Sequence, residues 1–251
     1  SRLFDNSGQQ IGTIAQGKMR PLGLTVTREG HIAVTDCAGK RVKIFNPEGH
    51  QVAEWGKSMF GWPYGIAANS KGQFIVSDAF NDTISIHQPD GRKLKIFGGS
   101  GRHSRQFKNP YHLTVDNADN IIVSDCGNHC IKIFDAQGQL IRKSSHHNKH
   151  HESVFQSISK NAAGMRFQST KTSLKSPRGL CVDPKGNILV ADDRGRVCIL
   201  NSEAKFERNL LTGEDSVHFA EDLAVNYRGQ LAVTEWNPNN MFAIKVFGLY
   251  E

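Results

Sequence analysis

Residues 110–134 contain three runs that decide the fold: Pro110-Tyr-His-Leu-Thr-Val115, Asp119-Asn-Ile-Ile-Val-Ser-Asp125 and Ile131-Lys-Ile-Phe134. Each run is short, rich in β-branched residues and bounded by Pro, Asn, Asp or Gly, which is typical of β-strands. The first two runs are almost continuously apolar, as expected for strands that neighbouring sheets bury on both faces. The third run alternates in polarity, here and in Val42-Lys-Ile-Phe45, so we expect a more peripheral strand.

The same three runs recur in register along the chain. The first run returns at Pro21-Leu-Gly, Pro63-Tyr-Gly and Pro177-Arg-Gly, with a degenerate copy at Glu221-Asp-Leu-Ala-Val. A turn with Gly49, Gly91 or Gly138 precedes a weaker fourth strand in the first three copies. Without an insertion, successive copies are 42 to 47 residues apart, which matches the roughly 40–50 residues of a β-propeller blade. No helical stretch separates the runs, which excludes a parallel α/β fold.

We expect one domain, 1–251, with an irregular segment in its second half. Clear repeats occupy about 21–56, 63–98, 110–143, 177–211 and 219–251. The third and fourth Pro signatures are 67 residues apart, so 144–176 is either an insertion or a degenerate sixth blade. The surplus is about 20–25 residues, whereas a full blade needs roughly twice as many. This arithmetic favours five blades plus a long loop.

The N-terminal residues predict how the ring closes. Leu3-Phe-Asp-Asn-Ser-Gly-Gln-Gln-Ile-Gly-Thr-Ile14 is similar to Ile133-Phe-Asp-Ala-Gln-Gly-Gln-Leu-Ile141, which spans the end of a third strand and a fourth strand. The fifth copy ends soon after its third strand, at Glu251. We therefore expect residues 9–15 to supply the missing outer strand of the last blade, which would remove a free sheet edge.

The Pro-x-Gly-Ile, Gly-x-Ile-x-Val-x-Asp and Asn-x-x-Ile-x-x-Phe signatures, in register from Pro21 to Phe247, resemble the NHL repeat. The resemblance implies an all-β propeller of NHL repeats. Because that family is usually six-bladed, we expect six blades, with five blades plus a long loop as the alternative.

A basic array of this kind also resembles the C-terminal domain of TRIM–NHL proteins, which are RING-type ubiquitin ligases and translational regulators, muscle proteins among them. The resemblance implies that the catalytic part lies outside this sequence. It also implies that a coiled coil outside the domain would make the parent chain oligomeric, whereas we expect the domain itself to be monomeric.

Composition places the chain among globular proteins. Of 251 residues, 38% are hydrophobic and 22% charged, which allows a sizeable core. No run approaches the roughly 20 apolar residues of a membrane span, and Ser1 does not open a signal region, so we expect a domain cut from a longer protein, with no membrane association. The five cysteines are odd in number and scattered, and Cys126 and Cys130 lack a second pair at zinc-ligand spacing. We therefore expect reduced thiols and a cytoplasmic location.

Repeated acidic residues are the first candidate site. Asp36, Asp78, Asp125 and Asp192 each end the second run of a clear copy. One active site does not need four equivalent groups around a ring, so we interpret them as structural acceptors of backbone N–H groups from the following loop. We interpret the Pro-x-Gly pieces as turn chemistry before the first strand.

Nothing in the sequence indicates catalysis. The histidine-rich segment 146–151 could bind a metal, but such a run is more typical of a solvated loop. There is no nucleophile elbow, metalloprotease motif or phosphate-binding glycine loop, and the first strands carry no recurring ligand. We predict no catalytic residue, no metal and no cofactor, and a domain that is not an enzyme.

The net charge of +7 and the pI near 9.2 indicate either a generally basic surface or one basic face. Because the strands alternate in direction, the loops after the second and fourth strands share one face, where basic and aromatic residues concentrate, Lys57 and Trp62 among them. The predicted binding face comprises Lys40, Arg41, Tyr64, Phe80, Arg102, Arg105, Lys108, Tyr111, His129, Arg178, Arg194 and Arg196.

Two classes of partner suit this face. Aromatic and Arg-rich loops favour protein recognition, so the first prediction is a platform that brings protein substrates or scaffold partners to a ubiquitin ligase. Basic residues interleaved with aromatics also suit single-stranded RNA, at about 1–3 kcal/mol per stacked base. The TRIM–NHL resemblance implies that RNA would be read at Tyr64, Tyr111 and Arg178. Leu22 in the first copy and the missing Pro in the fifth depart from that pattern.

Overall fold

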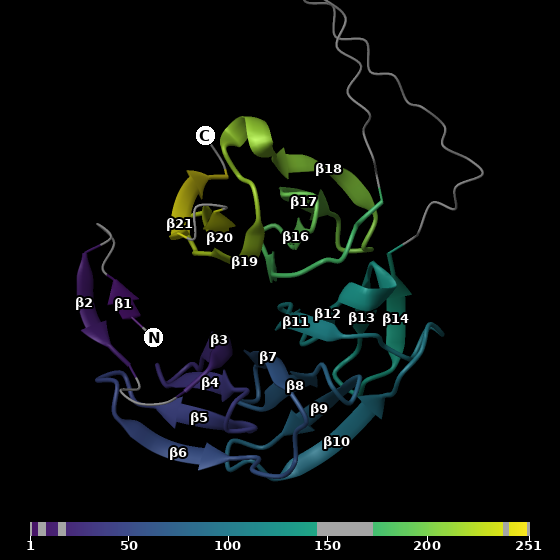
Figure 1. Cartoon of the computed structure of the whole chain (residues 1–251). Coiled ribbons are helices and arrows are strands. Elements are labelled where there is room, and N and C mark those ends of the chain that lie inside the picture. The colour runs from purple at the N-terminus through teal and green to yellow at the C-terminus, as the bar shows by residue number, and fades with distance from the viewer. Residues whose placement is uncertain (1, 5–8, 15–18, 145–172, 238–240, 250–251) are drawn as a thin grey trace, which may run out of the picture.

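The computed structural model describes residues 2–4, 9–14, 19–144, 173–237 and 241–249, and most of these residues form a β-propeller of five antiparallel sheets (Figure 1). The strands of each blade follow one another in sequence from the axis outward, so that β3, β7, β11, β15 and β19 are innermost. Blade 1 comprises β3 (Pro21–Val26), β4 (Ile32–Asp36), β5 (Arg41–Phe45) and β6 (Gln51–Trp55); blade 2, β7 (Pro63–Ala68), β8 (Phe74–Asp78), β9 (Thr83–His87) and β10 (Lys93–Gly98); blade 3, β11 (Pro110–Val115), β12 (Ile121–Asp125), β13 (Cys130–Phe134) and β14 (Leu140–Lys143); blade 4, β15 (Leu180–Val182), β16 (Ile188–Asp192), β17 (Arg196–Leu200) and β18 (Phe206–Leu211); and blade 5, β19 (Ala220–Val225), β20 (Gln230–Asn237) and β21 (Met241–Gly248). Two short 3-10 turns, η1 (Cys126–Asn128) and η2 (Gly213–Asp215), complete the order, and no helix in these ranges could cross a membrane.

The expectation of six blades is wrong, because the described residues form five. The physical reason is chain length, since the surplus between blades 3 and 4 is about half of the roughly 40–50 residues that a blade needs. Of the segment 144–176, residues 145–172 lie outside the described part, and residues 173–176 lead into blade 4.

The structure does not show the predicted ring closure. β2 (Gln10–Thr13) pairs with β1 (Arg2–Phe4) in a separate two-stranded sheet, and blade 5 has three strands in the described ranges. The N-terminal segment instead contacts blade 1, where Ile14 is buried against Ile32, Val34 and Phe45. The last strand of blade 5, β21, exposes three apolar side chains: Phe242, Ile244 and Val246.

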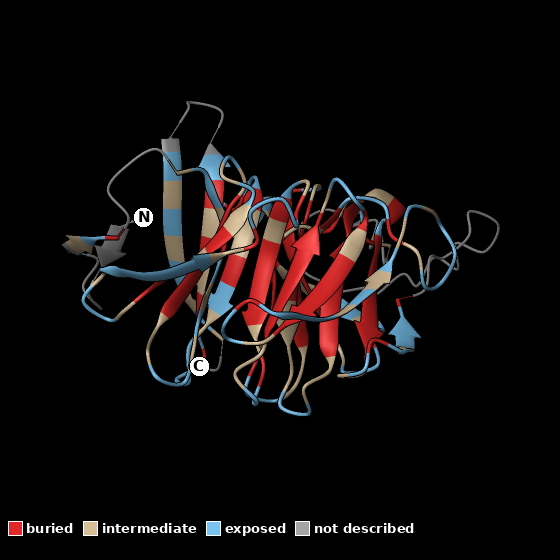
Figure 2. Cartoon of the chain, turned by 90° about the horizontal axis from the view of Figure 1, so that it is seen from below, coloured by how far each residue is buried: buried red, intermediate tan, exposed pale blue. Residues whose placement is uncertain are grey.

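The core lies between the blades. β4, β8, β12 and β16 are buried along their whole length. Figure 2 shows buried strands in the interior and exposed residues in the loops at both ends of the strands. Separate apolar clusters fill the spaces between blades 1 and 2, 2 and 3, 3 and 4, and 4 and 5. Both faces of a central strand therefore need apolar side chains, which explains the continuous apolar runs in the sequence.

In blades 1 and 2 the Pro-x-Gly pieces lie inside the innermost strands, so their interpretation as turns before the strand is wrong there, whereas in blade 4 Pro177-Arg-Gly179 precedes β15. Pro63 pairs with Asp78, and the register then shifts before Ile66, so that Tyr64 and Gly65 form a bulge. β3 and β11 shift at the same place. The proline costs no ladder hydrogen bond here because each innermost strand is the edge of its sheet.

Glycine in this bulge allows neighbouring blades to approach each other. A Cβ on Gly23 would lie 2.4 Å from the carbonyl oxygen of Tyr64, in the next blade. The hydroxyl of Thr35 links the two blades at this point. It accepts the N–H of Gly23 at 2.8 Å and donates to the carbonyl of Tyr64 at 2.6 Å. Ser77 repeats the arrangement between blades 2 and 3, with Gly65 and Tyr111 at 2.8 and 2.5 Å.

Replacing Gly65 with Ala tests this close approach. The added carbon would lie 2.6 Å from the carbonyl oxygen of Tyr111, so β7 and β11 would have to separate. We expect the free energy of unfolding to fall by about 2 kcal/mol or more in urea denaturation. The control is Gly213→Ala, where no atom lies within 4 Å of the new carbon. A Gly65→Ala variant as stable as this control would contradict the proposed role of Gly65.

His87 makes the stability of the chain depend on pH. Its buried ring lies 4.7 Å from Trp55 and 5.6 Å from Phe60 between ring centroids, with Nδ1 3.2 Å from the Gly91 carbonyl and Nε2 2.8 Å from Ser85 Oγ. Burial lowers the pKa of His87 below its ordinary value of 6.5.

Since the unfolded chain binds the proton first, the contribution of His87 to stability is complete above pH 6.5 and is lost as the pH falls toward the lower folded pKa. We expect the wild type to lose stability faster than His87→Gln between pH 7 and 5, by at most about 1.4 kcal/mol per pH unit. Denaturation of both proteins across this range measures the difference. Parallel pH profiles would show that His87 does not titrate in this range.

Candidate binding face

Strand-end carboxylates hold the loops of the candidate face in place. Asp78 accepts the N–H groups of Gly61 and Trp62, which precede β7, at 2.7 and 2.9 Å. It also accepts those of Phe80 and Asn81, which follow β8, both at 3.1 Å. One buried side chain thus joins the loop that enters a blade to the loop that leaves its second strand.

The same contacts recur around the ring with different partners. Asp36 accepts from Arg20 and Gly39, Asp125 from Lys108, and Asp192 from Lys175 and Arg194. Glu235 occupies the position in blade 5 and accepts from His218. The sequence predicted that these carboxylates accept N–H groups from the loop after the second strand. In the structure they also accept N–H groups from the loop before the first strand.

In blade 3 the carboxylate is part of a fully buried ion pair. Lys132 Nζ lies 2.7 Å from Asp125, and both side chains have 0% exposure. The ammonium also donates to the carbonyls of His103 and Gln106 and lies 5.0 Å from the centroid of Phe107. These contacts fasten the loop 99–109 to the blade.

The role of Lys132 was not predicted, because the alternating polarity of this strand indicated a peripheral position. A signal was present, since Lys43 and Lys245 occupy the same strand position and also face the acids Asp36 and Glu235, at 4.0 and 2.5 Å. An acid and a lysine in fixed register on adjacent strands predict an ion pair.

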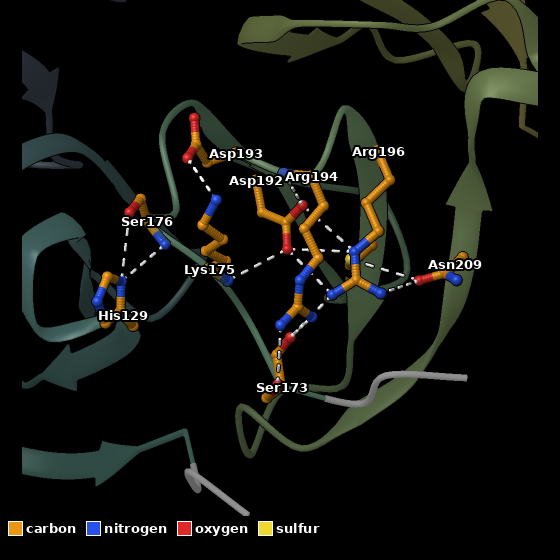
Figure 3. Close-up of polar contacts among 10 residues, drawn as sticks. His129, Ser173, Lys175, Ser176, Asp192, Asp193, Arg194, Arg196 and Asn209 are labelled. Carbon is orange, nitrogen blue, oxygen red and sulfur yellow. Dashed lines mark hydrogen bonds and ion pairs between the residues drawn. The ribbon is translucent and has the colours of Figure 1, made fainter. Parts of the chain in front are cut away.

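Blade 4 uses Arg196 as its buried cation, so Arg196 does not belong to the predicted binding face. Its guanidinium lies 3.0 Å from Asp192 and also donates to Asn209 Oδ1 at 2.8 Å and to the Ser173 carbonyl at 2.9 Å (Figure 3). Arg194 is exposed but donates to the same Ser173 carbonyl.

Other cationic or polar groups near blade 4 are also engaged. His129 accepts the N–H of Ser176 at 3.0 Å, and Lys175 lies 3.2 Å from Asp193 (Figure 3). On blade 1, the predicted face residue Arg41 lies 2.7 Å from Glu54. These contacts reduce the charge that the residues offer to a partner.

The side chains at the x position of Pro-x-Gly meet one another near the axis. Tyr64 and Tyr111 stack with centroids 4.4 Å apart and planes 9° apart. Arg178 binds both carboxylate oxygens of Glu221, at 3.0 and 2.8 Å. Burial raises the pKa of Tyr64 to about 12 and also raises that of Tyr111, so both phenols are neutral at pH 7.

Two copies lack the glycine of the motif, and their substitutes meet. His112 replaces it in blade 3 and Asp222 in blade 5, and Nδ1 of His112 lies 3.4 Å from the Asp222 carboxylate. Ser124, which corresponds to Thr35 and Ser77, is buried with no hydrogen-bond partner for its hydroxyl in the described residues. The contact between His112 and Asp222 was not predicted, although both departures from the repeat are visible in the sequence.

The remaining predicted cations lie in loops of blades 1 to 3, and loops of the same face also carry exposed apolar side chains. Phe80, Met59 and Trp62 are 74%, 49% and 41% exposed. We call this surface the cation–aromatic patch; its members are Arg20, Lys40, Lys57, Met59, Trp62, Phe80, Arg102, Arg105 and Lys108. All six cations are exposed, and none makes an ion pair within the described ranges.

Contacts join part of the patch. The Arg20 guanidinium lies 5.8 Å from the Trp62 ring centroid, within cation–π distance. Phe80 lies so close to the backbone of Gly61 that a Cβ there would be 2.6 Å from the Phe80 ring. Met59 and Arg20 were not among the predicted face residues, because sequence position alone does not reveal which loop residues stay exposed.

The structure offers no metal site among the residues that it describes, since no three His, Cys, Asp or Glu side chains there group together. The histidine-rich segment 146–151, considered above for metal binding, lies outside the described residues.

Comparison with known proteins identifies the repeat. The NHL repeat model matches residues 19–45, 107–134 and 174–202, so the chain carries NHL repeats in a β-propeller. No curated protein matches the sequence.

Similar solved structures share the fold at low sequence identity. A streptogramin B lyase is 14% identical with a TM-score of 0.66, covering 99% of this chain and 75% of its own. Virginiamycin B lyase from Staphylococcus aureus is 12% identical with a TM-score of 0.64, covering 98% and 76%. A chain of a nidogen/laminin complex is 18% identical with a TM-score of 0.70, covering 92% and 76%. Both enzymes and a protein complex therefore use this architecture, which does not by itself determine function.

The buried ion pair of blade 3 can be tested by Lys132→Met, which leaves Asp125 buried without its cation. We expect a loss of about 3–5 kcal/mol in unfolding free energy and faster amide hydrogen exchange in residues 99–107. The matched control is Lys43→Met, because Lys43 is partly exposed and 4.0 Å from its acid, so about 1 kcal/mol is expected. Equal losses would mean that Lys132 acts only through packing.

Proposed function

We propose that this propeller is a non-catalytic binding platform whose cation–aromatic patch recognises an acidic segment of a partner protein. The observation that carries the proposal is the division of the loop face. The six cations of the patch, on blades 1 to 3, make no ion pair within the described ranges, whereas Lys175, Arg178 and Arg196 on blade 4 are paired.

Electrostatics supports an acidic partner. The strand-end carboxylates beneath the patch are buried and accept several backbone N–H groups, so they oppose an incoming anion less than exposed acids would. Unpaired surface cations steer an acidic partner and set the orientation in which it binds.

Apolar contact supports a protein rather than a small ion. Phe80, Met59 and Trp62 are large exposed side chains beside the cations, and aromatic residues commonly supply binding energy in protein interfaces. The loop backbone beneath them is held by Asp78, so little conformational entropy would be lost on binding.

The finer part of the proposal concerns the parent protein. NHL repeats and the basic face support the substrate-recognition domain of a TRIM–NHL ubiquitin ligase acting in the cytoplasm, with general likeness to Thin, a muscle TRIM–NHL protein. The five cysteines all lie in the described ranges and are unpaired, in keeping with a reducing compartment.

Single-stranded RNA is the second candidate, because the patch also interleaves cations with exposed rings. The axial residues favour it less. The stacked Tyr64–Tyr111 pair leaves no space for a base between its rings, and Glu221 already occupies Arg178.

Charge reversal tests the platform. The variant Arg102→Glu, Arg105→Glu, Lys108→Glu should bind a fluorescein-labelled Asp/Glu peptide with one central Phe at least about tenfold more weakly than wild type in fluorescence polarisation at 0.15 M salt. Phe80→Ala should also weaken binding, because it removes an apolar contact.

The control reverses Lys71 and Arg92, which are exposed on turns of the opposite face, and Lys93, which is exposed at the start of β10 on that face. It changes the net charge equally, and we expect unchanged binding. If both triple variants lose the same peptide affinity, the binding depends on net charge and not on the patch. If the chain binds poly(U) with a steep salt dependence and does not bind the peptide, the partner is RNA and not a protein.

A further inference from the structure

The loop 99–109 has a fixed base and an exposed tip. Phe107 is buried, and its N–H and carbonyl bind the Gly99 carbonyl and the Gly101 N–H at 2.9 and 2.8 Å. Asn128 donates to the Gly101 carbonyl at 2.8 Å, and Lys132 binds two carbonyls further along the loop. The backbone of this loop is therefore anchored at Gly101, His103, Gln106 and Phe107, on both sides of its exposed tip.

Ser104 lies at this tip between two arginines. A turn with a hydrogen bond from the Gln106 N–H to the His103 carbonyl at 3.0 Å presents it, and Arg102, Ser104 and Arg105 are all exposed. The Ser104 hydroxyl makes no hydrogen bond in the described part of the chain, and the two arginines make no ion pair there. The hydroxyl is thus accessible to solvent with two cations beside it in sequence.

We propose that Ser104 is a phosphorylation site for an arginine-directed protein kinase and that the phosphate switches off the cation–aromatic patch. The regulatory half rests on the proposed function; the modification half does not. Arginines beside an exposed serine offer charged, multidentate hydrogen bonding to acidic residues of a kinase substrate groove.

The reaction is a phosphoryl transfer. The Ser104 Oγ forms a bond to the γ-phosphorus of Mg-ATP, and the bond from that phosphorus to the β–γ bridging oxygen breaks. ADP leaves, and the hydroxyl proton passes to the catalytic base of the kinase. The kinase and ATP supply all other participants.

The consequence follows from charge. A phosphoserine carries about −1.5 to −2 charges at pH 7, which offsets the two positive charges of Arg102 and Arg105. The phosphate oxygens would also compete with a partner carboxylate for the same guanidinium groups. Because screening at physiological salt acts over about 8 Å, the effect is greatest at this loop.

The test uses the chain as described here, Mg-ATP and the catalytic subunit of cyclic-AMP-dependent protein kinase. We expect phosphate on Ser104 by peptide mass spectrometry, no phosphate at that position in Ser104→Ala, and at least about fivefold slower incorporation in Arg102→Gln. Ser58 is the internal control, since it is exposed on a loop of the same face without a neighbouring arginine. Phosphorylation of Ser58 and not Ser104 would overturn the site.

Binding of the acidic peptide probe separates the two halves. The phosphorylated chain should bind the probe at least about tenfold more weakly than the unmodified chain, and Ser104→Ala treated with kinase should bind normally. Equal binding before and after phosphorylation would overturn the switch. If Ser104 is phosphorylated but even the unmodified chain fails to bind, the proposed function fails and the modification site stands.

Discussion

A carboxylate at the end of the second strand of each blade connects the propeller to the loops of its candidate face. Asp78 binds four backbone N–H groups from two loops. Because such a group is buried, its desolvation must be offset by donors, and in blades 3 and 4 a buried Lys132 or Arg196 also neutralises its charge. Loss of the carboxylate would therefore free both loops at once. The patch on blades 1 to 3 depends on these anchors for its shape.

Repetition builds the ring, and departures from it make the blades differ. Glycine in the innermost strands and the hydroxyls of Thr35 and Ser77 draw blades 1, 2 and 3 together. At the next contact His112 replaces the glycine and the Ser124 hydroxyl has no partner in the described residues, so this link is absent. The replaced glycines bring His112 and Asp222 together near the axis.

The basic residues of the candidate face also differ from blade to blade. A count of basic residues along the loops treats Arg178, Arg196 and Arg102 alike, yet Arg178 binds Glu221, Arg196 is buried against Asp192, and Arg102 is exposed. The acids responsible are distant in sequence or hidden on an adjacent strand. Pairing removes Lys175, Arg178 and Arg196 of blade 4 from the basic surface, whereas the patch cations on blades 1 to 3 make no ion pair in the described residues. An acidic partner would therefore bind only to the part of the ring where the cations are unpaired.

The sequence by itself determined the all-β propeller and its NHL repeats, because alternating runs, turns and a blade-length period are local properties that each copy repeats. The number of blades was decided by the fold, since residues 144–176 could be interpreted as a sheet or a loop. So was the role of Lys132, because burial between blades depends on neighbours that polarity alternation cannot show. The binding face stays a prediction, and which of its cations remain unpaired depends on contacts between distant residues. Ion pairing and exposure are properties of the assembled ring, and only the tertiary structure could assign them.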